Sequence, residues 1–344
     1  MTPGLYYSHP ACLQHDPRVH SPGHPDTPER LLALEAALEE RDWLGWERRE
    51  APAASESQLE LVHTAEHVRR IRELCGRGGG AIDPDTFVGE PSYQAALHAA
   101  GGPCEMVRAL LAGEASVGFC GVRPSGHHAE AGRAMGFCLF NNISVGAAWA
   151  IAELGIERVL ILDWDVHAGN GTAEIFRRRS DVLVASLHEE GLFPGTGPLG
   201  DAGSGEGEGY TINLPVPPGS EEELWLGLIE EVVLPAAAAF APELILISAG
   251  FDAHELDPLA NCRLQTGSFV QMALLVREAA RAAGVPLGVV LEGGYNRAVL
   301  AECVCAILPA LAGEGEPEPA PSIPFGPDRV LARARDQVGR HWPL

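Results

Sequence analysis

Four segments of the sequence place ionisable or metal-binding side chains directly after short runs of apolar residues. They read Arg-Pro-Ser-Gly-His-His at 123–128, Asp-Trp-Asp-Val-His at 163–167, Ser-Ala-Gly-Phe-Asp at 248–252 and Glu-Gly-Gly-Tyr at 292–295. In an open parallel sheet, ligands bind beyond the carboxyl ends of the strands. If the apolar runs are strands of such a sheet, the four segments meet at one edge and line one site.

The pair Asp165 and His167 indicates a metal site. Residues two apart at the end of a strand point to the same side, and Asp252 adds a second carboxylate from another strand. Three protein ligands leave a coordination position open, which is typical of a catalytic metal site. An Asp-x-His pair alone is more often a helix cap beside a satisfied histidine. The ionisable residues in the other three segments favour the metal site over this alternative.

The adjacent residues His127 and His128 are candidates for a general base, because an imidazole titrates near neutral pH. Asp163 and Asn170 flank the metal ligands and are available to hold one imidazole tautomer. Tyr295 follows two glycines, and a phenol O–H there can donate to a developing oxyanion. Considered alone, the two histidines could also lie in an exposed loop. The tyrosine could be a buried residue with a hydrogen bond to the backbone. Both alternatives stay open.

The segments that must position these residues alternate between two types. Short runs rich in Val, Ile and Leu predict buried strands at 116–122, 158–163, 181–187, 243–250 and 286–291. Segments of helical period lie at 28–41, 141–154, 220–240, 266–283 and 330–338. This alternation predicts an α/β fold with a mostly parallel sheet covered by helices on both faces. We expect a single domain over 1–344, with a Pro/Glu-rich surface segment at 313–328.

Composition excludes several classes of protein. The formal net charge is −23, from 24 Lys+Arg against 47 Asp+Glu, which argues against a nucleic-acid partner. No apolar run is long enough to span a membrane, and no signal peptide is visible. The eight cysteines show no disulfide or zinc-knuckle spacing, so we expect reduced thiols and a cytoplasmic location. His63 and His67 are expected on the surface of a helix. Assembly into a homo-oligomer stays open.

The motifs around these residues resemble the zinc-dependent histone deacetylase family. The bacterial, class II-like branch is the closest match, which includes deacetylase-like amidohydrolases, acetylpolyamine amidohydrolases and acetoin-utilisation proteins. The resemblance extends from about His9 to Leu311. It implies the arginase/deacetylase fold, a three-layer αβα arrangement around a mostly parallel sheet of about eight strands.

The resemblance also implies roles for individual residues. Asp165, His167 and Asp252 would bind one zinc ion. His128 would act as general base and then general acid, with His127 as an electrostatic partner held by Asp163. Tyr295 would polarise the amide carbonyl. Ala168 departs from the commonest pattern, in which a second histidine follows, and Asn170 replaces the aspartate of class I enzymes.

Further positions follow from the same resemblance. It implies an acyl-lysine channel and its rim from Asp85, Gly136, Phe137, Phe193 and Leu259. It implies a structural potassium site from Asp163, Asp165, His167, Ser186 and Leu187. Arg30 would lie near the exit for acetate.

The function that these observations favour is a zinc-dependent amidohydrolase, a hydrolase of linear amide bonds that deacylates an acetylated amine through a metal-activated water. The short loop 15–27 fits a channel open to peptides better than one narrowed for free polyamines, and Leu259 stands where some relatives carry a polyamine-selecting glutamate. We therefore expect acetyl-lysine or a small acylated amine, such as an acetylpolyamine, as the substrate. A di-manganese ureohydrolase needs a second bridging aspartate at 254, where the sequence has His254. A non-catalytic acyl-amine binder would be expected to lack the tyrosine or a histidine. Both alternatives stay open.

Overall fold

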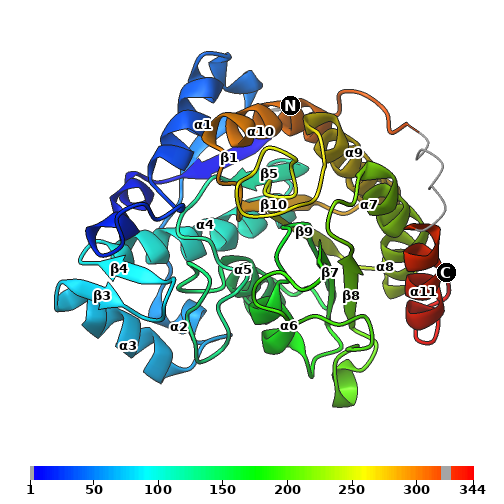
Figure 1. Cartoon of the computed structure of the whole chain (residues 1–344), viewed down its shortest axis with the longest axis horizontal. Helices are drawn as coiled ribbons and strands as arrows, with labels where there is room; N and C mark the ends of the chain where they lie inside the picture. Colours follow the sequence, from blue (N-terminus) through cyan, green and yellow to red (C-terminus); the bar gives the residue numbers. More distant parts are fainter. Residues whose placement is uncertain (1–3, 319–326) are drawn as a thin grey trace.

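The structure, a computed structural model, describes residues 4–318 and 327–344. Within these residues, eight parallel strands form one sheet in the order β2-β1-β5-β10-β9-β6-β7-β8 (Figure 1). Their bounds are β1 Leu5–Ser8, β2 Glu47–Glu50, β5 Val117–Cys120, β6 Val159–Asp163, β7 Val182–Glu189, β8 Thr211–Val216, β9 Leu244–Ala249 and β10 Leu287–Leu291. The short strands β3 (Gly79–Ala81) and β4 (Phe87–Gly89) form a separate antiparallel pair.

Helices cover both faces of the large sheet (Figure 1). One layer comprises α1 (Glu29–Glu39), α7 (Glu222–Leu228), α8 (Leu234–Phe240), α9 (Thr266–Ala283), α10 (Arg297–Ala312) and α11 (Pro327–Val338). The other comprises α2 (Glu56–Leu59), α3 (Ala65–Gly76), α4 (Ser92–Leu111), α5 (Asn142–Glu153) and α6 (Asn170–Phe176). The predicted α/β class, three layers and parallel sheet of about eight strands are confirmed.

The five predicted strands are the five central ones, β5, β10, β9, β6 and β7. Their residues are all buried, since helices cover both faces, and this produces the continuous apolar runs that the sequence shows. The strands of this sheet without a prediction are the edge strands β2 and β8 and the strand β1, which lies between β2 and β5. The edge strand β2 reads Glu-Arg-Arg-Glu and is mostly exposed, so no apolar run announces it.

The register aligns the carboxyl ends of four neighbouring strands. Asp163 at the end of β6 lies opposite Ser248 in β9, and Ala249 lies opposite Leu291 in β10. Val290 in turn lies opposite Cys120 at the end of β5. The four chemistry-bearing segments therefore leave the sheet side by side, from β5, β10, β9 and β6.

Several helical segments differ from the sequence prediction, since α4, α6 and α10 lie outside the predicted helices. The predicted helix 220–240 is interrupted by one turn of π-helix at Ile229–Val233, between α7 and α8. The helix α4 was not predicted, because Gly101, Gly102 and Pro103 interrupt its pattern. These glycines allow close packing instead, since a Cβ built on Gly101 would overlap the backbone of the segment 52–54.

Several features concern the periphery. Residues 313–316 are exposed, as expected for the surface segment 313–328, whereas residues 319–326 of that segment lie outside the described residues. No helix in the described part of the chain combines the length and apolar character needed to cross a membrane. All eight cysteines are free thiols. The sequence contains no lysine, so its 24 Lys+Arg residues are all arginine, and the ion pairs between described residues use arginine or histidine as the cation.

Candidate active site

Asp165, His167 and Asp252 come together beyond the carboxyl ends of β6 and β9. One ligand atom from each lies within 4.8 Å of the other two, and all three residues are buried. The Nδ1 atom of His167 lies 3.0 Å from Asp165 Oδ1 and 3.2 Å from Asp252 Oδ2. Asp252 Oδ2 is buried and has no hydrogen bond of good geometry among the described residues. Two carboxylates and one imidazole nitrogen therefore converge on one point.

This donor set fits a divalent cation. A Cβ built on Gly293 would overlap one carboxylate oxygen of both Asp165 and Asp252, so the glycine leaves room for the convergence. Burial lowers the pKa of His167, but the two carboxylates beside its ring raise it to about 10. Burial and the charge of Asp165 raise the pKa of Asp252. The cluster is thus short of positive charge, which a zinc-type cation with nitrogen and oxygen ligands would supply.

The two histidines of the segment after β5 are held in different charge states. His127 Nδ1 lies 2.9 Å from Asp163 Oδ2, and His128 Nδ1 lies 2.8 Å from Asn170 Oδ1. Burial opposes a charge on His127, but the charges of Asp163 and Asp165 raise its pKa well above the usual range. Burial and then the positive charges of His127 and His167 lower the pKa of His128 well below it.

The tautomer of His128 follows from its partner. Asn170 Nδ2 donates to Glu130 Oε1 and to the carbonyl of His128, so Asn170 Oδ1 is the atom that faces the ring. An amide oxygen only accepts, so His128 Nδ1 carries the proton and donates it. The other ring nitrogen, Nε2, is therefore left unprotonated and can accept a proton.

Tyr295 is held by its backbone and its ring. Its N–H donates to Asp257 Oδ2 at 2.6 Å, and Asp257 Oδ1 accepts from Leu259 N at 3.0 Å. The guanidinium of Arg30 lies 4.8 Å from the centre of the Tyr295 ring and donates to the Gly294 carbonyl. Burial raises the pKa of the phenol well above its usual value, so the phenol stays a neutral O–H donor.

Asp257 was missed by the sequence analysis. Burial and then the charge of Asp252 raise its pKa to about 6. An aspartate that accepts a hydrogen bond from the amide two residues further on forms an Asx turn. The run Asp257-Pro-Leu259, which is typical of such a turn, is therefore the sequence signal for this residue.

The predicted channel residues lie around these groups. Phe137 packs edge-on against Tyr295 with ring centres 5.7 Å apart, and Phe193 packs edge-on against His128 at 5.1 Å. Phe193 is 37% exposed, so one side of this pair faces solvent. Gly136 has a φ of +57°, and a Cβ on it would overlap the rings of both His128 and Phe193.

The other predicted rim residues have clear partners. Thr86 Oγ1 donates to Asp85 Oδ1 at 3.1 Å and accepts from Phe137 N at 3.1 Å, which places the Asp85 carboxylate beside the channel residue. Leu259 is half-buried, and its amide is one of those held by Asp257. Leu259 therefore lies close to the segment that carries Tyr295.

The residues predicted for potassium are all buried. Ser186 lies opposite Asp163 in the β6–β7 register and accepts from Gly169 N, while Asp163 Oδ1 accepts from Asp165 N. Leu187 follows in β7, and Asp165 and His167 belong to the cluster described above. The arrangement puts these groups on one segment and its neighbouring strand, and the potassium assignment stays a prediction.

Arg30, predicted near an acetate exit, is fully buried. Each of its three guanidinium nitrogens has a partner, namely the Gly294 carbonyl, Asp26 Oδ1 and the Glu292 carbonyl. In the structure it therefore braces the segment that carries Tyr295, and a role in acetate exit stays a prediction.

The surface position expected for His63 and His67 is wrong. They are 4% and 2% exposed. His67 is one of the buried residues of α3, and His63 lies two residues before that helix. His63 Nδ1 donates to the Glu130 carbonyl, and His63 Nε2 accepts from Asn141 N. His67 Nε2 donates to the Leu139 carbonyl at 2.9 Å. Together they clamp the segment 130–141, which includes Gly136 and Phe137.

The chain matches known proteins over most of its length. The family described as the histone deacetylase domain matches residues 24–311. A histone deacetylase-like amidohydrolase of Pseudomonas aeruginosa is 42% identical over 294 residues, covering 85% of this chain and 77% of that protein. A probable deacetylase of Archaeoglobus fulgidus is 38% identical over 319 residues, covering 91% and 87%. A crystal structure of the HDA15 HD domain has a TM-score of 0.92 at 34% identity, covering 99% of this chain and 95% of that one.

These matches confirm the family resemblance seen in the motifs and the arginase/deacetylase fold. They also confirm the expected class of enzyme, a hydrolase that acts on amide bonds. The family match spans the four segments that meet at the edge of the sheet. We conclude that the chain belongs to the histone deacetylase family.

Proposed function

We propose that the protein is a zinc-dependent deacylase that removes the acetyl group from acetyl-lysine or from a small acylated amine. The observation that carries this proposal is the buried cluster of Asp165, His167 and Asp252 beside a neutral His128. When bound there, a divalent cation with an open coordination position supplies Lewis acidity.

The residues of the chain account for the proton transfers. His128 Nε2, free of a proton, takes one from the attacking water as its oxygen bonds to the acyl carbon. The phenol of Tyr295 donates a hydrogen bond to the oxyanion of the tetrahedral intermediate. His128 then returns the proton to the departing nitrogen as the C–N bond breaks. The products are acetate and a free amine.

The cationic His127 has a separate role in this scheme. Asp163 accepts its Nδ1 proton, so the positive charge stays fixed beside His128. This charge favours the neutral form of His128 before each turnover and therefore keeps it available as a base.

The proposed substrate class rests on the residues at the entrance of the site. Phe137 and Phe193 offer aromatic faces on two sides of the site, which suit the apolar stem of a lysine side chain. In this proposal the Asp85 carboxylate, which Thr86 links to Phe137, accepts hydrogen bonds from a peptide backbone. We also propose that potassium binds at a site formed by Asp163, Asp165, His167, Ser186 and Leu187. Residues 1–344 would form one domain.

The structure gives no support to a di-manganese centre. His254 packs parallel to Phe269, and its Nδ1 accepts from Leu256 N. It therefore does not supply the second bridging carboxylate that such a centre needs.

The test combines metal analysis with turnover. We expect the purified protein to hold about one zinc per chain and to hydrolyse a fluorogenic acetyl-lysine peptide. Chelation should abolish this turnover, and added zinc should restore it. Asp252→Asn should lose both metal and activity, whereas Glu206→Gln, which changes an exposed carboxylate, should keep both. Zinc-loaded protein that turns over no acetyl-lysine peptide, acetylspermidine or acetylputrescine would contradict the proposal.

A further inference from the structure

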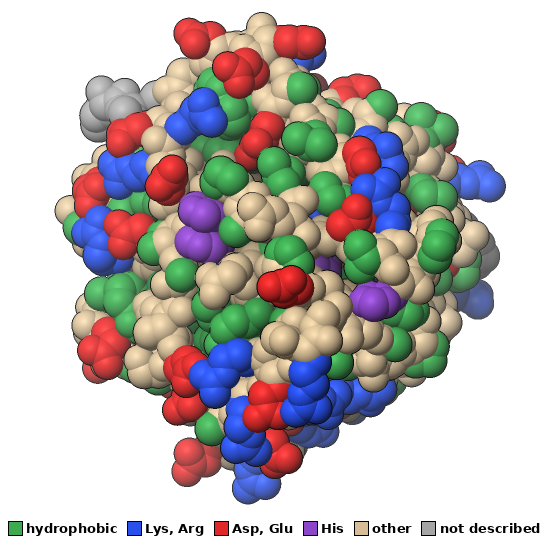
Figure 2. Space-filling view, turned by 90° about the vertical axis from the view of Figure 1, so that its left-hand side faces the viewer, with side chains coloured by type: hydrophobic (Ala, Val, Ile, Leu, Met, Phe, Trp, Pro, Cys, Tyr) green, Lys and Arg blue, Asp and Glu red, His purple; other side chains and the backbone are tan. Residues whose placement is uncertain are grey.

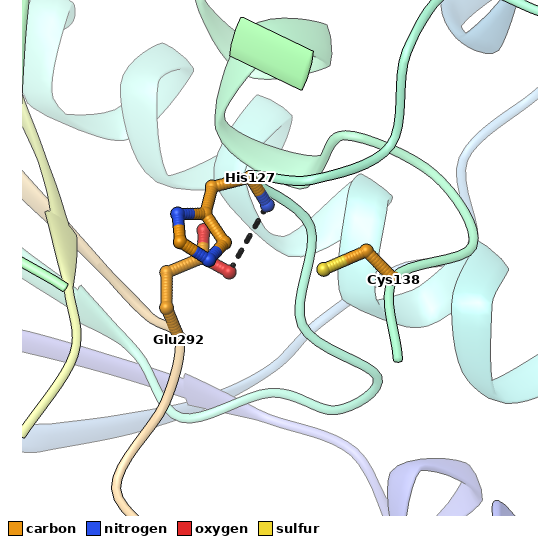
Figure 3. A group of neighbouring side chains, drawn as sticks. All are labelled: His127, Cys138 and Glu292. Carbon is orange, nitrogen blue, oxygen red and sulfur yellow. Dashed lines mark hydrogen bonds between the residues drawn. The ribbon is translucent and has the colours of Figure 1, made fainter. Parts of the chain in front are cut away.

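Glu292 is a buried carboxyl group that links three of the segments at the edge of the sheet. It is the first residue after β10 and is fully buried. Its Oε2 atom accepts hydrogen bonds from Gly126 N at 2.7 Å and His127 N at 3.2 Å, the latter drawn in Figure 3. Its Oε1 atom accepts from Ser248 Oγ at 3.0 Å. One side chain from β10 thereby holds the segment after β5 and the end of β9.

The main chain of Glu292 makes a second set of links to the same surroundings. Its carbonyl accepts from Ser125 Oγ at 3.1 Å and from the Arg30 guanidinium at 2.5 Å. Ser125 immediately precedes the two amides that the carboxylate binds. Glu292 is therefore joined to the segment 125–127 through both its side chain and its backbone.

The groups connected in this way are the ones that must act together on one substrate. Tyr295 is only three residues beyond Glu292, and His128 is the residue after the second amide that Glu292 binds. Between them, Gly293 N donates to Asp165 Oδ2 at 2.8 Å. Glu292 thus links the segment with the proposed base to the segment with the proposed phenol donor.

A metal site is an alternative use of the same group. His127, Cys138 and Glu292 offer ligand atoms within 4.8 Å of one another (Figure 3). However, both oxygens of Glu292 already accept hydrogen bonds from N–H or O–H donors. Burial and then the charge of Glu292 raise the pKa of Cys138 well above its usual range, which favours the thiol over the metal-binding thiolate. The hydrogen bonds therefore favour a positioning role over a metal.

We propose that Glu292 is a positioning residue for deacylation, whose carboxyl oxygens hold the segment with His127 and His128 at a fixed spacing from Tyr295. The proposal rests on the proposed function, which defines the reaction. It predicts that the acceptor oxygens matter and that the negative charge does not. Burial raises the pKa of Glu292 to about 7.

The test compares three substitutions at this position. Glu292→Gln keeps one oxygen for the two backbone amides and turns its NH2 group to Ser248, whose hydroxyl can accept. Glu292→Asp is too short to reach the amides, and Glu292→Ala has no acceptor. We expect kcat of Glu292→Gln within about threefold of the wild type. We expect kcat of the other two to fall about 100-fold, since a displacement of about 1 Å can cost that much. The KM and the zinc content should stay within about twofold.

Several outcomes would overturn the proposal. An Ala variant that keeps its kcat would show that the spacing does not depend on Glu292, and a Gln variant as slow as Ala would show that charge is required. If Glu292→Ala does not fold, the comparison of Gln with Asp at equal melting temperature decides the question. Ser248→Ala removes one of the three side-chain links and should cost only a few-fold in kcat. An inactive wild-type protein would instead contradict the proposed function, so the two failures are distinguishable.

Discussion

A single glycine decides whether the two carboxylates of the metal cluster can approach each other. We expect Gly293→Ala to weaken zinc binding about 10- to 100-fold, because the new Cβ would displace Asp165 and Asp252 from their positions. Competition with a chromophoric chelator measures the affinity. Gly267→Ala is the matched control, since a Cβ there meets nothing within 4 Å. Equal affinities in the two variants would mean that the carboxylates are not held as described.

Some residues of the site could be predicted from the sequence, and others could not. Asp165, His167 and Asp252 were predicted together because each directly follows an apolar strand, where topology brings side chains to one edge. Asp257 and Glu292 were not predicted as functional, since they act by accepting backbone N–H groups. A sequence does not show which amide a buried carboxylate will meet, so such residues emerge only from the fold.

At the scale of elements, the clamp that His67 in α3 and His63, two residues before α3, form on the segment 130–141 depends on neutral histidines. Burial and then the charge of His67 lower the pKa of His63 to about 3. An unfolded chain binds this proton near pH 6.5, so the folded state loses relative stability as pH falls from about 6.5 towards 3. The contribution of His63 is therefore fully present only above about pH 6.5.

We expect His63→Gln to lower the free energy of unfolding at pH 8 by about 1–3 kcal/mol, because buried hydrogen bonds are lost. Below pH 6.5 this deficit should shrink by about 1.4 kcal/mol per pH unit, since the variant carries no titrating group at that position. Urea unfolding at pH 8 and pH 5 measures the difference. His20→Gln, at an exposed histidine, is the control and should change little at either pH. A deficit that is equal at both pH values would contradict the assignment.

The central strands carry uninterrupted apolar runs because helices cover both faces of the sheet. The helices 28–41, 141–154 and 266–283 show a helical period in the sequence. The edge strand β2 lacks an apolar run, and α4 contains Gly101, Gly102 and Pro103. The glycines of α4 allow close packing against other segments. The local sequence does not show which segments will pack there, so it does not predict this helix. Local pattern thus predicts the central strands well, because their surroundings are uniform.

At the scale of the whole molecule, the net charge of −23 acts on approaching substrates. Acidic side chains are spread over the face shown in Figure 2, with basic side chains among them. A field of this sign attracts cationic ligands and is screened by salt. We therefore expect kcat/KM for an arginine-flanked acetyl-lysine peptide to fall several-fold from about 20 mM to about 300 mM salt.

An aspartate-flanked peptide should respond in the opposite direction over the same salt range, because screening then removes a repulsion. The kcat of both peptides should stay constant, since steering acts on encounter and not on the bound complex. An identical salt response of the two peptides would show that charge does not guide association.

The ion pairs of this protein use arginine and histidine because the chain has no lysine. The proposed substrate is an acylated lysine side chain. An enzyme without lysine cannot carry this group itself. No side chain of the enzyme carries the amine that acyl donors modify, so one copy offers no acyl-lysine to another. In a mixture with an acylated protein, every acyl-lysine detected by mass spectrometry would belong to that other protein.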